Sequence, residues 1–326
     1  MTEQQSVPIN KMSSTPIKVG ISSCLVGQEV RFDGGHKQSK YCQQVLANHF
    51  DFEPICPEMG IGLGTPRRAI RLIKDEDIIR VVASDGSFDV TDKLNEFSEK
   101  TSATLDHLSG YVFCAKSPSC GMERVTLYQA GTNNGQRDGV GVFAARVMKD
   151  HPLLPVEEDG RLNDSLLREN FITRVIAYHH WKCLIASGVT MAKLMSFHAQ
   201  HKYLLMAHNS ALYYKLGPML GGTGETAEQI APKYVALFMK ILATLANRKS
   251  HSNTLSHLQG YFKRNLDSTQ RTDLAEIIDQ YREGLLPLMA PITLINHYLK
   301  INPDAYLQQQ IYLHPHPDEL KLRYNH

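Results

Sequence analysis

Short apolar runs alternate with amphipathic stretches along the first half of the chain. Three runs rich in β-branched and aromatic residues predict buried strands: residues 17–23, 52–56 and 110–116. Three stretches with apolar residues at helical spacing predict helices: residues 39–50, 93–108 and 139–152. Strands that alternate with helices in this way are typical of an α/β domain with a largely parallel sheet.

Two further segments of this half have weaker patterns. Residues 71–91 predict a β-hairpin that turns at Asp85 and Gly86. Residues 131–141 are rich in Asn and Gly and predict a surface loop.

Only helical periodicity is found after about residue 160. Asp164 is a plausible N-cap for a helix that runs to Ile185, and further helical patterns follow as far as Ile301. Glycines and a proline at 217–224 predict a break between two of these helices. The sequence therefore predicts a disordered tail (1–16), an α/β domain with a largely parallel sheet (17–160) and an all-α domain (161–326).

The composition is that of a soluble globular protein. Hydrophobic residues make up 42% and charged residues 21% of the 326 positions. No apolar run is long enough for a membrane span, the amino terminus lacks the apolar run of a signal peptide, and six cysteines show no regular framework. We therefore expect a cytoplasmic protein with no membrane partner.

Charge is divided unevenly between the two predicted domains. Residues 1–160 carry 17 Lys and Arg against 21 Asp and Glu, a net charge of −4. Residues 161–326 carry 18 against 12, a net charge of +6, with 11 of the 15 histidines. A basic domain favours a polyanion such as nucleic acid, although a solvated basic helical surface explains the charge equally well.

Three cysteines carry the chemistry that the pattern suggests. Cys24, Cys56 and Cys120 each follow an apolar run and lie in a turn. Because the carboxyl ends of parallel strands line one crevice, these thiols could meet there and hold a metal centre with an open ligand position. The spacing leaves three readings open, namely buried thiols, a zinc ion or an iron–sulfur cluster. Cys42, Cys114 and Cys183 are expected to be core residues.

The segments around these cysteines resemble a known family. "ISSCLVGQEVRFDGGHK", "CPEMGIGLGTPRR" and "AKSPSCG" are similar, in order and spacing, to the signature segments of the TudS-type thiouracil desulfidase domain. "FHAQHKYLLMAH" and "YYKLG" in the helical half resemble the YbgA-type domain that is often fused behind it. The fusion as a whole resembles the RudS desulfidases, which remove sulfur from 4-thiouridine in tRNA.

The resemblance implies a set of site residues. Cys24, Cys56 and Cys120 would hold a 4Fe–4S cluster with one iron open to the substrate sulfur, and Glu58 and Ser117 match positions that act in catalysis. The residues themselves suggest contacts to the base or its phosphate, with ion pairing within the fold as the alternative. These candidate substrate-binding residues are Arg31, Asp33, Lys37, Arg67 and Arg68.

The helical half offers candidates for RNA contacts. Five cations are candidates for binding phosphates: Lys202, Arg248, Lys249, Lys263 and Arg264. Two aromatic pairs are candidates for stacking an unpaired base, Tyr213 with Tyr214 and Tyr261 with Phe262, although core aromatics at helical spacing explain them too.

The leading hypothesis is an iron–sulfur-dependent, non-redox tRNA 4-thiouridine desulfidase. Three alternatives stay open: the same chemistry on free thiouracil or its nucleosides, with the helical domain serving dimerisation; a non-catalytic iron–sulfur RNA-binding or sensor protein; and a zinc hydrolase with three cysteine ligands.

Overall fold

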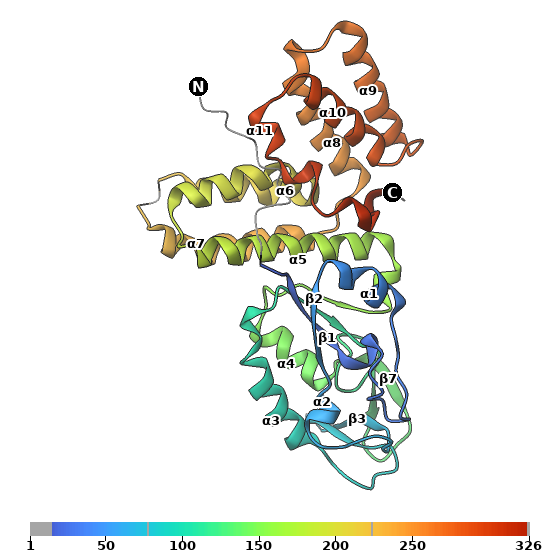
Figure 1. Ribbon diagram of the computed structural model, residues 1–326. Coiled ribbons are helices and arrows are strands. Elements are labelled where there is room, and N and C mark those ends of the chain that lie inside the picture. Colours follow the sequence, from blue (N-terminus) through green and yellow to red (C-terminus); the bar gives the residue numbers. More distant parts are fainter. Residues whose placement is uncertain (1–14, 77, 223, 325–326) are drawn as a thin grey trace. The chain divides into compact units, whose positions relative to one another are not determined.

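The computed structural model describes residues 15–76, 78–222 and 224–324, which form two compact units (Figure 1). The α/β unit spans Thr15–Asp164, and the helical unit begins at Ser165. The sequence had suggested a division near residue 160. The expected tail at 1–16 lies outside the described residues except for Thr15 and Pro16.

A four-stranded parallel sheet forms the centre of the α/β unit. Its strands are β1 (Lys18–Ser22), β2 (Asp51–Ile55), β5 (Gly110–Phe113) and β8 (Val156–Glu158), in the order β2-β1-β5-β8. Val19 of β1 pairs with Phe52 on one side and with Gly110 on the other. The largely parallel sheet predicted from the apolar runs is confirmed, and all four strands end at the same edge.

Helix α4 (Val142–Asp150) packs against this sheet, and helix α3 (Thr91–Ser102) packs against α4 (Figure 1). Phe143 of α4 contacts the rings of Tyr111 and Phe113 on β5, with centroid distances of 5.9 and 6.4 Å. The helix predicted at 39–50 is shorter than expected, because α1 (Lys40–Gln44) ends at Gln44 and a 3₁₀ turn, Leu46–Asn48, follows.

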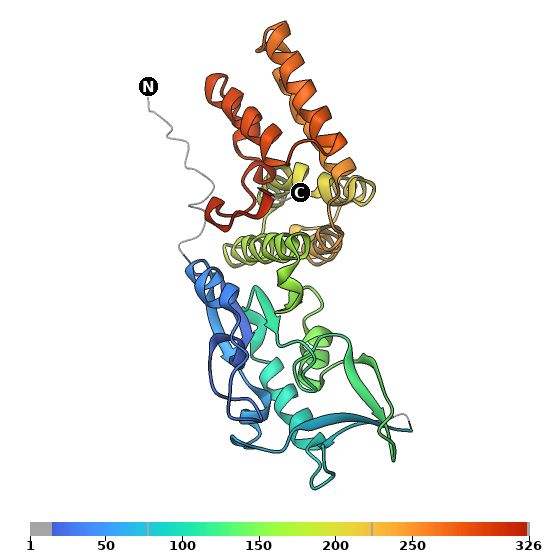
Figure 2. The ribbon, with the colours of Figure 1, turned by 90° about the vertical axis from the view of Figure 1, so that its right-hand side faces the viewer.

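A second sheet of four strands adjoins α3 (Figure 2). Its strands are β4 (Ile78–Ala83), β3 (Ile70–Asp75), β6 (Val125–Gln129) and β7 (Gly135–Gly139). Leu72, Val81 and Val125 of this sheet pack with Leu94 of α3 to form a small core.

Two predictions for this region need correction. The long hairpin turns between Asp75 and Ile78, whereas the predicted turn at Asp85 and Gly86 leads only to a short antiparallel return, in which Asp89 pairs with Val82. Residues 131–141 contain strand β7, which pairs with β6. Because β7 is an edge strand exposed along almost its whole length, it carries no apolar signal.

The helical unit consists of helices and 3₁₀ turns throughout its described residues. Its helices are α5 (Ser165–Ala186), α6 (Met191–Leu220), α7 (Ala227–Ala243), α8 (Arg248–Gln259), α9 (Ser268–Glu283), α10 (Met289–Ile301) and α11 (Ala305–Gln308). The prediction of an all-α carboxyl-terminal domain is confirmed.

The break predicted at 217–224 is confirmed, because α6 ends at Leu220 and α7 begins at Ala227. Helix α6 is kinked at Asn209, where φ and ψ are −158° and 92°, and it continues through Pro218 before it ends. Pro218 has no N–H to donate, so it removes one hydrogen bond from the last turns of this helix. The core between α5, α6 and α7 is aromatic: the rings of Trp181, Phe197 and Tyr234 contact one another.

Among the described residues, no single helix is long and apolar enough to cross a membrane. The segments Ala227–Ala243 and Arg248–Arg264 meet that length and composition only when they are counted together across a bend of 117°.

Candidate active site

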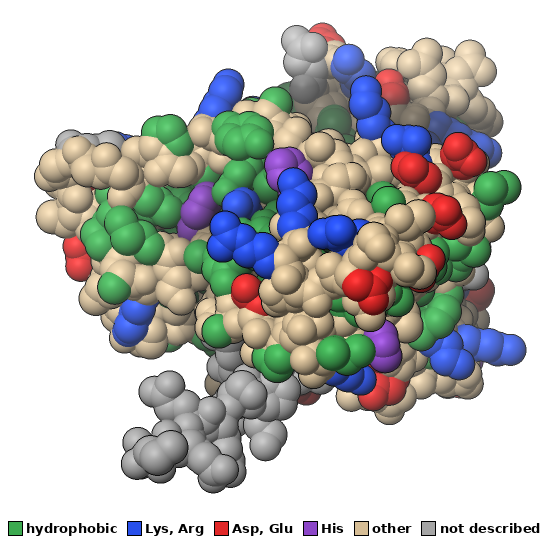
Figure 3. Space-filling model, turned by 90° about the horizontal axis from the view of Figure 1, so that it is seen from above, with side chains coloured by type: hydrophobic (Ala, Val, Ile, Leu, Met, Phe, Trp, Pro, Cys, Tyr) green, Lys and Arg blue, Asp and Glu red, His purple; other side chains and the backbone are tan. Residues whose placement is uncertain are grey.

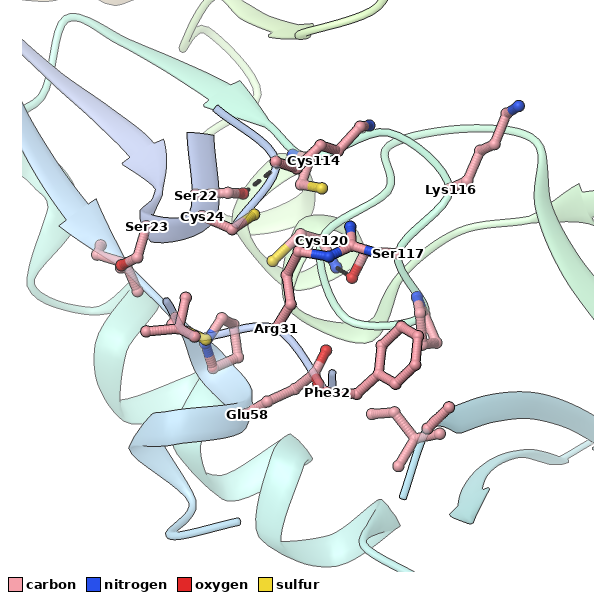
Figure 4. Close-up of a pocket in the computed structure, with 18 of the residues that line it drawn as sticks. Ser22, Ser23, Cys24, Arg31, Phe32, Glu58, Cys114, Lys116, Ser117 and Cys120 are labelled. Atoms are coloured by element: carbon pink, nitrogen blue, oxygen red, sulfur yellow. Dashed lines mark hydrogen bonds between the residues drawn. The ribbon is translucent and has the colours of Figure 1, made fainter. Parts of the chain in front are cut away.

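A cavity of about 360 Å³ opens at the carboxyl ends of the parallel strands. Cys24 follows β1, Cys56 follows β2, and Cys120 lies in the loop after β5; all three line this cavity. Figure 4 shows Cys24 and Cys120 pointing into the same space, together with Glu58 and Ser117. The structure thus brings the three predicted cysteines to one place, at the sheet edge where ligands bind in open α/β folds.

A tight turn presents Cys24. The 3₁₀ turn Ser23–Val26 begins directly at the end of β1 and is closed by Gly27, whose φ of 87° is readily adopted only by glycine. Cys24 is 9% exposed. The chain then returns along the sheet edge, where the N–H of Lys37 donates to the carbonyl of Cys24 at 3.0 Å.

Cys56 occupies the N-cap of the short helix α2 (Pro57–Gly60), with Pro57 at the first helical position. Burial raises the pKa of the Cys56 thiol, while the backbone N–H groups of Met59 and Glu58 donate to the sulfur and oppose that rise. Donors of this kind stabilise a thiolate, which is the form that binds a metal.

The loop that carries Cys120 is fixed by backbone and hydroxyl contacts. Ser117 Oγ accepts from the N–H of Cys120 at 3.1 Å and from the N–H of Ser119 at 3.2 Å. The carbonyl of Ser119 in turn accepts from the N–H of Phe143 in α4 at 2.9 Å. Gly141 allows this close approach, because a Cβ there would lie 2.6 Å from the carbonyl carbon of Ser119.

The donor set fits an iron–sulfur group better than a single ion. Among the described residues, no three His, Cys, Asp or Glu side chains are placed to hold one metal ion together. The three thiols instead surround a cavity, and soft thiolates are the ligands that iron–sulfur clusters use. The buried hydroxyl of Tyr111 has no hydrogen-bond partner in the described structure, and burial, together with the three cysteines when ionised, raises its pKa.

Cys114 is buried, as predicted, but it lies beyond the end of its strand and also lines the cavity. Strand β5 ends at Phe113, so Cys114 is the first residue of the following loop. Its N–H donates to Ser22 Oγ at 3.0 Å (Figure 4), and its side chain hydrogen-bonds that of Cys24. That hydrogen bond and burial raise the pKa of the Cys114 thiol.

Glu58 and Arg67 form a buried ion pair at the edge of the cavity. Arg67 Nη2 and Nε donate to Glu58 Oε2 at 2.5 and 3.0 Å, and the two side chains are 5% and 15% exposed. Ser119 Oγ donates to the other carboxylate oxygen, Oε1, at 3.0 Å. The orientation of the Glu58 carboxylate is therefore fixed from both sides.

Comparison with known proteins identifies the family to which the α/β unit belongs. Residues 19–159 match the profile of the family described as 2-thiouracil desulfurase. The protein YbbK of Bacillus subtilis (strain 168) is 33% identical over 155 residues, which cover 45% of this chain and 98% of the relative. The chain belongs to the 2-thiouracil desulfurase family.

Other comparisons extend this result to both units. Residues 202–317 match DUF1722, described as a protein of unknown function. The protein YbgA of Escherichia coli (strain K12) is 35% identical over 167 residues, which cover 51% of this chain and 96% of the relative. The solved structure of the [4Fe-4S]-dependent thiouracil desulfidase TudS is 27% identical, with a TM-score of 0.37 over 45% of this chain and 93% of that one. The family resemblance stated from the motifs is confirmed.

The other substrate-binding candidates of the desulfurase domain divide into two groups. Arg31 and Lys37 line the cavity, and Lys37 Nζ contacts Asp159 at 3.1 Å. Burial lowers the pKa of Lys37, but Cys114 and Asp159 raise it by more.

Asp33 and Arg68 do not line the cavity, so the structure does not support a contact with substrate there. Asp33 is exposed and accepts from the N–H of Gly35 at 3.1 Å. Arg68 is 72% exposed and pairs with Asp85 at 3.1 Å.

For Arg67 the structure favours the alternative to a phosphate contact, which is ion pairing within the fold. Arg67 lines the cavity, but its guanidinium donates to Glu58 and to the carbonyls of Gly64 and Val30, at 2.6 and 2.8 Å. Its donors are therefore committed within the fold, and it positions Glu58 rather than binding a phosphate.

Phe32, which lines the cavity, and Ser119, which contacts Glu58 from outside the lining, are not among the residues that the sequence points to. Phe32 is 42% exposed at the cavity and lies under the Arg31 guanidinium, 5.5 Å from the ring centroid. Ser119 is buried and reaches Glu58 across 61 residues of sequence. An aromatic residue beside an arginine in a cysteine-bearing segment is a signal for Phe32, whereas no local signal marks Ser119.

The DUF1722 domain contains a second hollow, of about 290 Å³. It is lined by Lys202, Tyr213, Tyr214 and His257, with Met206, Gly217 and Pro218. Tyr214 is 64% exposed. Figure 3 looks onto the helical unit, where Lys and Arg side chains lie among hydrophobic and His side chains.

The remaining RNA candidates differ in how available they are. Lys249, Lys263 and Arg264 are exposed. Arg248 Nη1 donates to the carbonyls of Tyr281 and Leu286, at 2.6 and 3.3 Å, so this arginine is committed to the interior of its unit. Phe262 is 2% exposed and is not available to stack a base, whereas Tyr261 is 40% exposed.

Proposed function

We propose that this protein is an iron–sulfur-dependent, non-redox desulfidase that converts 4-thiouridine in tRNA to uridine and releases sulfide. One observation carries the proposal: within the desulfurase domain, Cys24, Cys56 and Cys120 line one cavity together with the carboxylate of Glu58. A three-thiolate donor set leaves one ligand position of a 4Fe–4S cluster free of protein.

The three cysteines would hold the cluster, each from the carboxyl end of a different segment of the sheet. When bound, such a cluster supplies an iron with an open position that acts as a Lewis acid toward sulfur. The exchange of C=S for C=O balances with one water: its oxygen enters the pyrimidine, and sulfur leaves with the two protons of that water. No oxidant or reductant is required.

Glu58 is the residue that would take a proton from the attacking water. Its carboxylate lines the cavity beside the cysteines, and a general base must be within hydrogen-bond reach of the proton that it abstracts. Arg67 donates twice to Oε2 and Ser119 donates once to Oε1, so Oε1 is the oxygen that keeps a lone pair for a further contact. Ser117 also lines the cavity: its hydroxyl oxygen accepts two N–H groups of the Cys120 loop, and its O–H is left to donate to the substrate.

Arg31 and Phe32 are the residues best placed to hold the pyrimidine. A half-exposed aromatic ring at a cavity can stack a base that has been taken out of an RNA stack. The guanidinium of Arg31 and the ammonium of Lys37 supply donors for the base or for its phosphate.

The helical unit supports tRNA as the substrate. Its region carries the net charge of +6, and its hollow combines two tyrosines with Lys202. Aromatic rings beside cations are the elements from which single-stranded nucleic acid sites are built. The exposed cations Lys249, Lys263 and Arg264 would add contacts to phosphates that do not depend on sequence.

The second candidate substrate is free thiouracil or its nucleosides. The description of the matched family favours it, and the cavity of about 360 Å³ lies at the small end of ligand pockets, for which about 300–1,000 Å³ is usual. The two candidates share one chemistry and differ in whether the helical unit contributes to it.

An anaerobic assay with two substrates tests both. The protein is purified without oxygen, its iron and sulfide are quantified, and sulfide release is measured with tRNA that carries 4-thiouridine and with free 4-thiouracil. We expect a brown protein that releases sulfide faster from the tRNA than from free 4-thiouracil, and we expect this ratio of rates to fall as the salt concentration rises. Equal activity on both substrates at all salt concentrations would favour the free base, and an iron-free protein would exclude the cluster.

A further inference from the structure

Tyr111 presents a buried polar atom for which the described structure offers no partner. It is the second residue of β5 and is 0% exposed, and its hydroxyl oxygen makes no hydrogen bond. Buried hydroxyls without a partner are rare in folded proteins, and a bound group that the hydroxyl contacts is one of the explanations for such an atom.

The packing around the ring fixes where this hydroxyl lies. Gly20 of β1 pairs with Tyr111 in the sheet, and a Cβ on Gly20 would come within 2.3 Å of the ring. The ring stacks on Phe113 with a centroid distance of 4.2 Å and meets Phe143 edge-on at 5.9 Å. Apolar contacts therefore hold the ring on all these sides, and the hydroxyl cannot turn out to water.

The hydroxyl lies within electrostatic reach of the three candidate ligands. Burial raises the pKa of Tyr111 well above its ordinary value, and Cys120, Cys56 and Cys24 each raise it further. These three cysteines come from separate segments and share only the cavity. Tyr111 itself does not line the cavity; it lies in β5, whose following loop carries Cys120, and its partner in the sheet, Gly20, lies four residues before Cys24.

We propose that the Tyr111 hydroxyl donates a hydrogen bond to a sulfur atom of the cluster held by Cys24, Cys56 and Cys120, either a bridging sulfide or a ligating thiolate. The inference rests on the cofactor of the proposed function. Tyr111 is then a positioning residue: it contacts neither the pyrimidine base nor the attacking water, and it stabilises the cluster from the side of the protein core. Hydrogen bonds to cluster sulfur stabilise the reduced form and raise the reduction potential.

The test compares wild type with Tyr111→Phe in the full-length, reconstituted protein. The variant keeps the ring and its packing and removes only the hydroxyl. We expect the midpoint potential to become more negative by about 59 mV, a tenfold change in the equilibrium for a one-electron couple. We also expect the cluster to be lost several-fold faster in air. Tyr128→Phe is the matched control, because Tyr128 lies in the second sheet against Arg71 and should leave the potential unchanged.

Two further measurements separate this role from a purely structural one. Thermal unfolding of the cluster-free proteins should show Tyr111→Phe to be at least as stable as wild type, since an unpaired hydroxyl is removed. Pulsed EPR of the reduced cluster in D₂O should show an exchangeable deuteron that is absent from the variant. Unchanged potential and deuteron coupling in Tyr111→Phe would overturn this inference alone, whereas a wild-type protein that binds no iron would overturn the proposed function.

Discussion

The guanidinium of Arg67 grips the carboxylate of Glu58 with two of its nitrogens, at 2.5 and 3.0 Å, in a pair that is almost fully removed from solvent. The same guanidinium binds the carbonyls of Gly64 and Val30, so it ties three segments of the cavity wall together. The planar fork of arginine suits this task, and the single ammonium of lysine does not.

Replacement of Arg67 should therefore damage both folding and turnover. Arg67→Met leaves a buried carboxylate without its cation, which costs about 3–5 kcal/mol of unfolding free energy. Urea unfolding and sulfide release measure the two effects. Arg80→Met is the control: Arg80 makes the same kind of fork on Asp89 but is 49% exposed, so stability should hardly change. Equal losses in the two variants would contradict a special role for Arg67.

Glu58→Gln tests the proposed base. Glutamine keeps the shape of the side chain and an oxygen that accepts from Arg67, but it cannot take a proton from water. We expect turnover to fall about 10²–10⁴-fold, with iron content unchanged. Sulfide release and iron quantitation on the same preparation give both numbers, and Glu96→Gln, an exposed partner of Lys100, serves as the control. A variant with full iron and full turnover would favour the sensor hypothesis, or a different base.

The sequence was a good guide to the parts of this site that depend on strand ends. Apolar runs located β1, β2 and β5, and parallel strands necessarily bring Cys24, Cys56 and the Cys120 loop to one edge of the sheet. The motifs also led to the correct family.

What the sequence could not supply were contacts made by loops and edges. Arg67 pairs with Glu58 because the intervening loop folds back, and no periodicity predicts that return. Strand β7 was missed because an exposed edge strand pairs through its backbone alone. The pattern assigns Cys114 to a strand because the apolar run continues past Phe113, where β5 ends, and element boundaries are the least reliable part of a pattern.

Gly141 should control whether the Cys120 loop can hold its ligand. Its backbone angles, φ −63° and ψ 140°, are open to alanine, so only the space decides the outcome. A Cβ there would lie 2.6 Å from the carbonyl carbon of Ser119 and 2.8 Å from the nitrogen of Cys120, and the loop would have to move. Gly141→Ala should lose about 1–3 kcal/mol of stability and much of its iron.

Gly160→Ala is the matched control for this steric argument. Gly160 also has angles that alanine adopts, φ −67° and ψ −37°, and its Cβ would meet nothing closer than Ala115 Cβ at 4.0 Å. Iron content measured after identical reconstitution compares the two variants. If Gly141→Ala retained as much iron as Gly160→Ala, docking of the Cys120 loop on α4 would not be required for the cluster.

The helical unit should be sensitive to acid. Burial lowers the pKa of His180 and His208 to about 4 and that of His201 to about 3, from an ordinary value of 6.5. Below pH 6.5 these histidines therefore bind protons in the unfolded chain but not in the folded unit. The free energy of unfolding is at its full value above pH 6.5 and decreases as the pH falls toward 4. At pH 5 each histidine costs roughly 2 kcal/mol.

Trp181 makes this prediction measurable in one unit alone. It is the sole tryptophan of the chain, is 5% exposed, and packs against Phe197 and Tyr234 in the helical core. Urea unfolding followed by tryptophan fluorescence should show a midpoint that is much lower at pH 5 than at pH 7.5. The visible absorption of a reconstituted cluster, followed in the same titration, reports on the α/β unit. If the urea midpoint reported by Trp181 fluorescence were the same at both pH values, protonation of these histidines would not destabilise the helical unit.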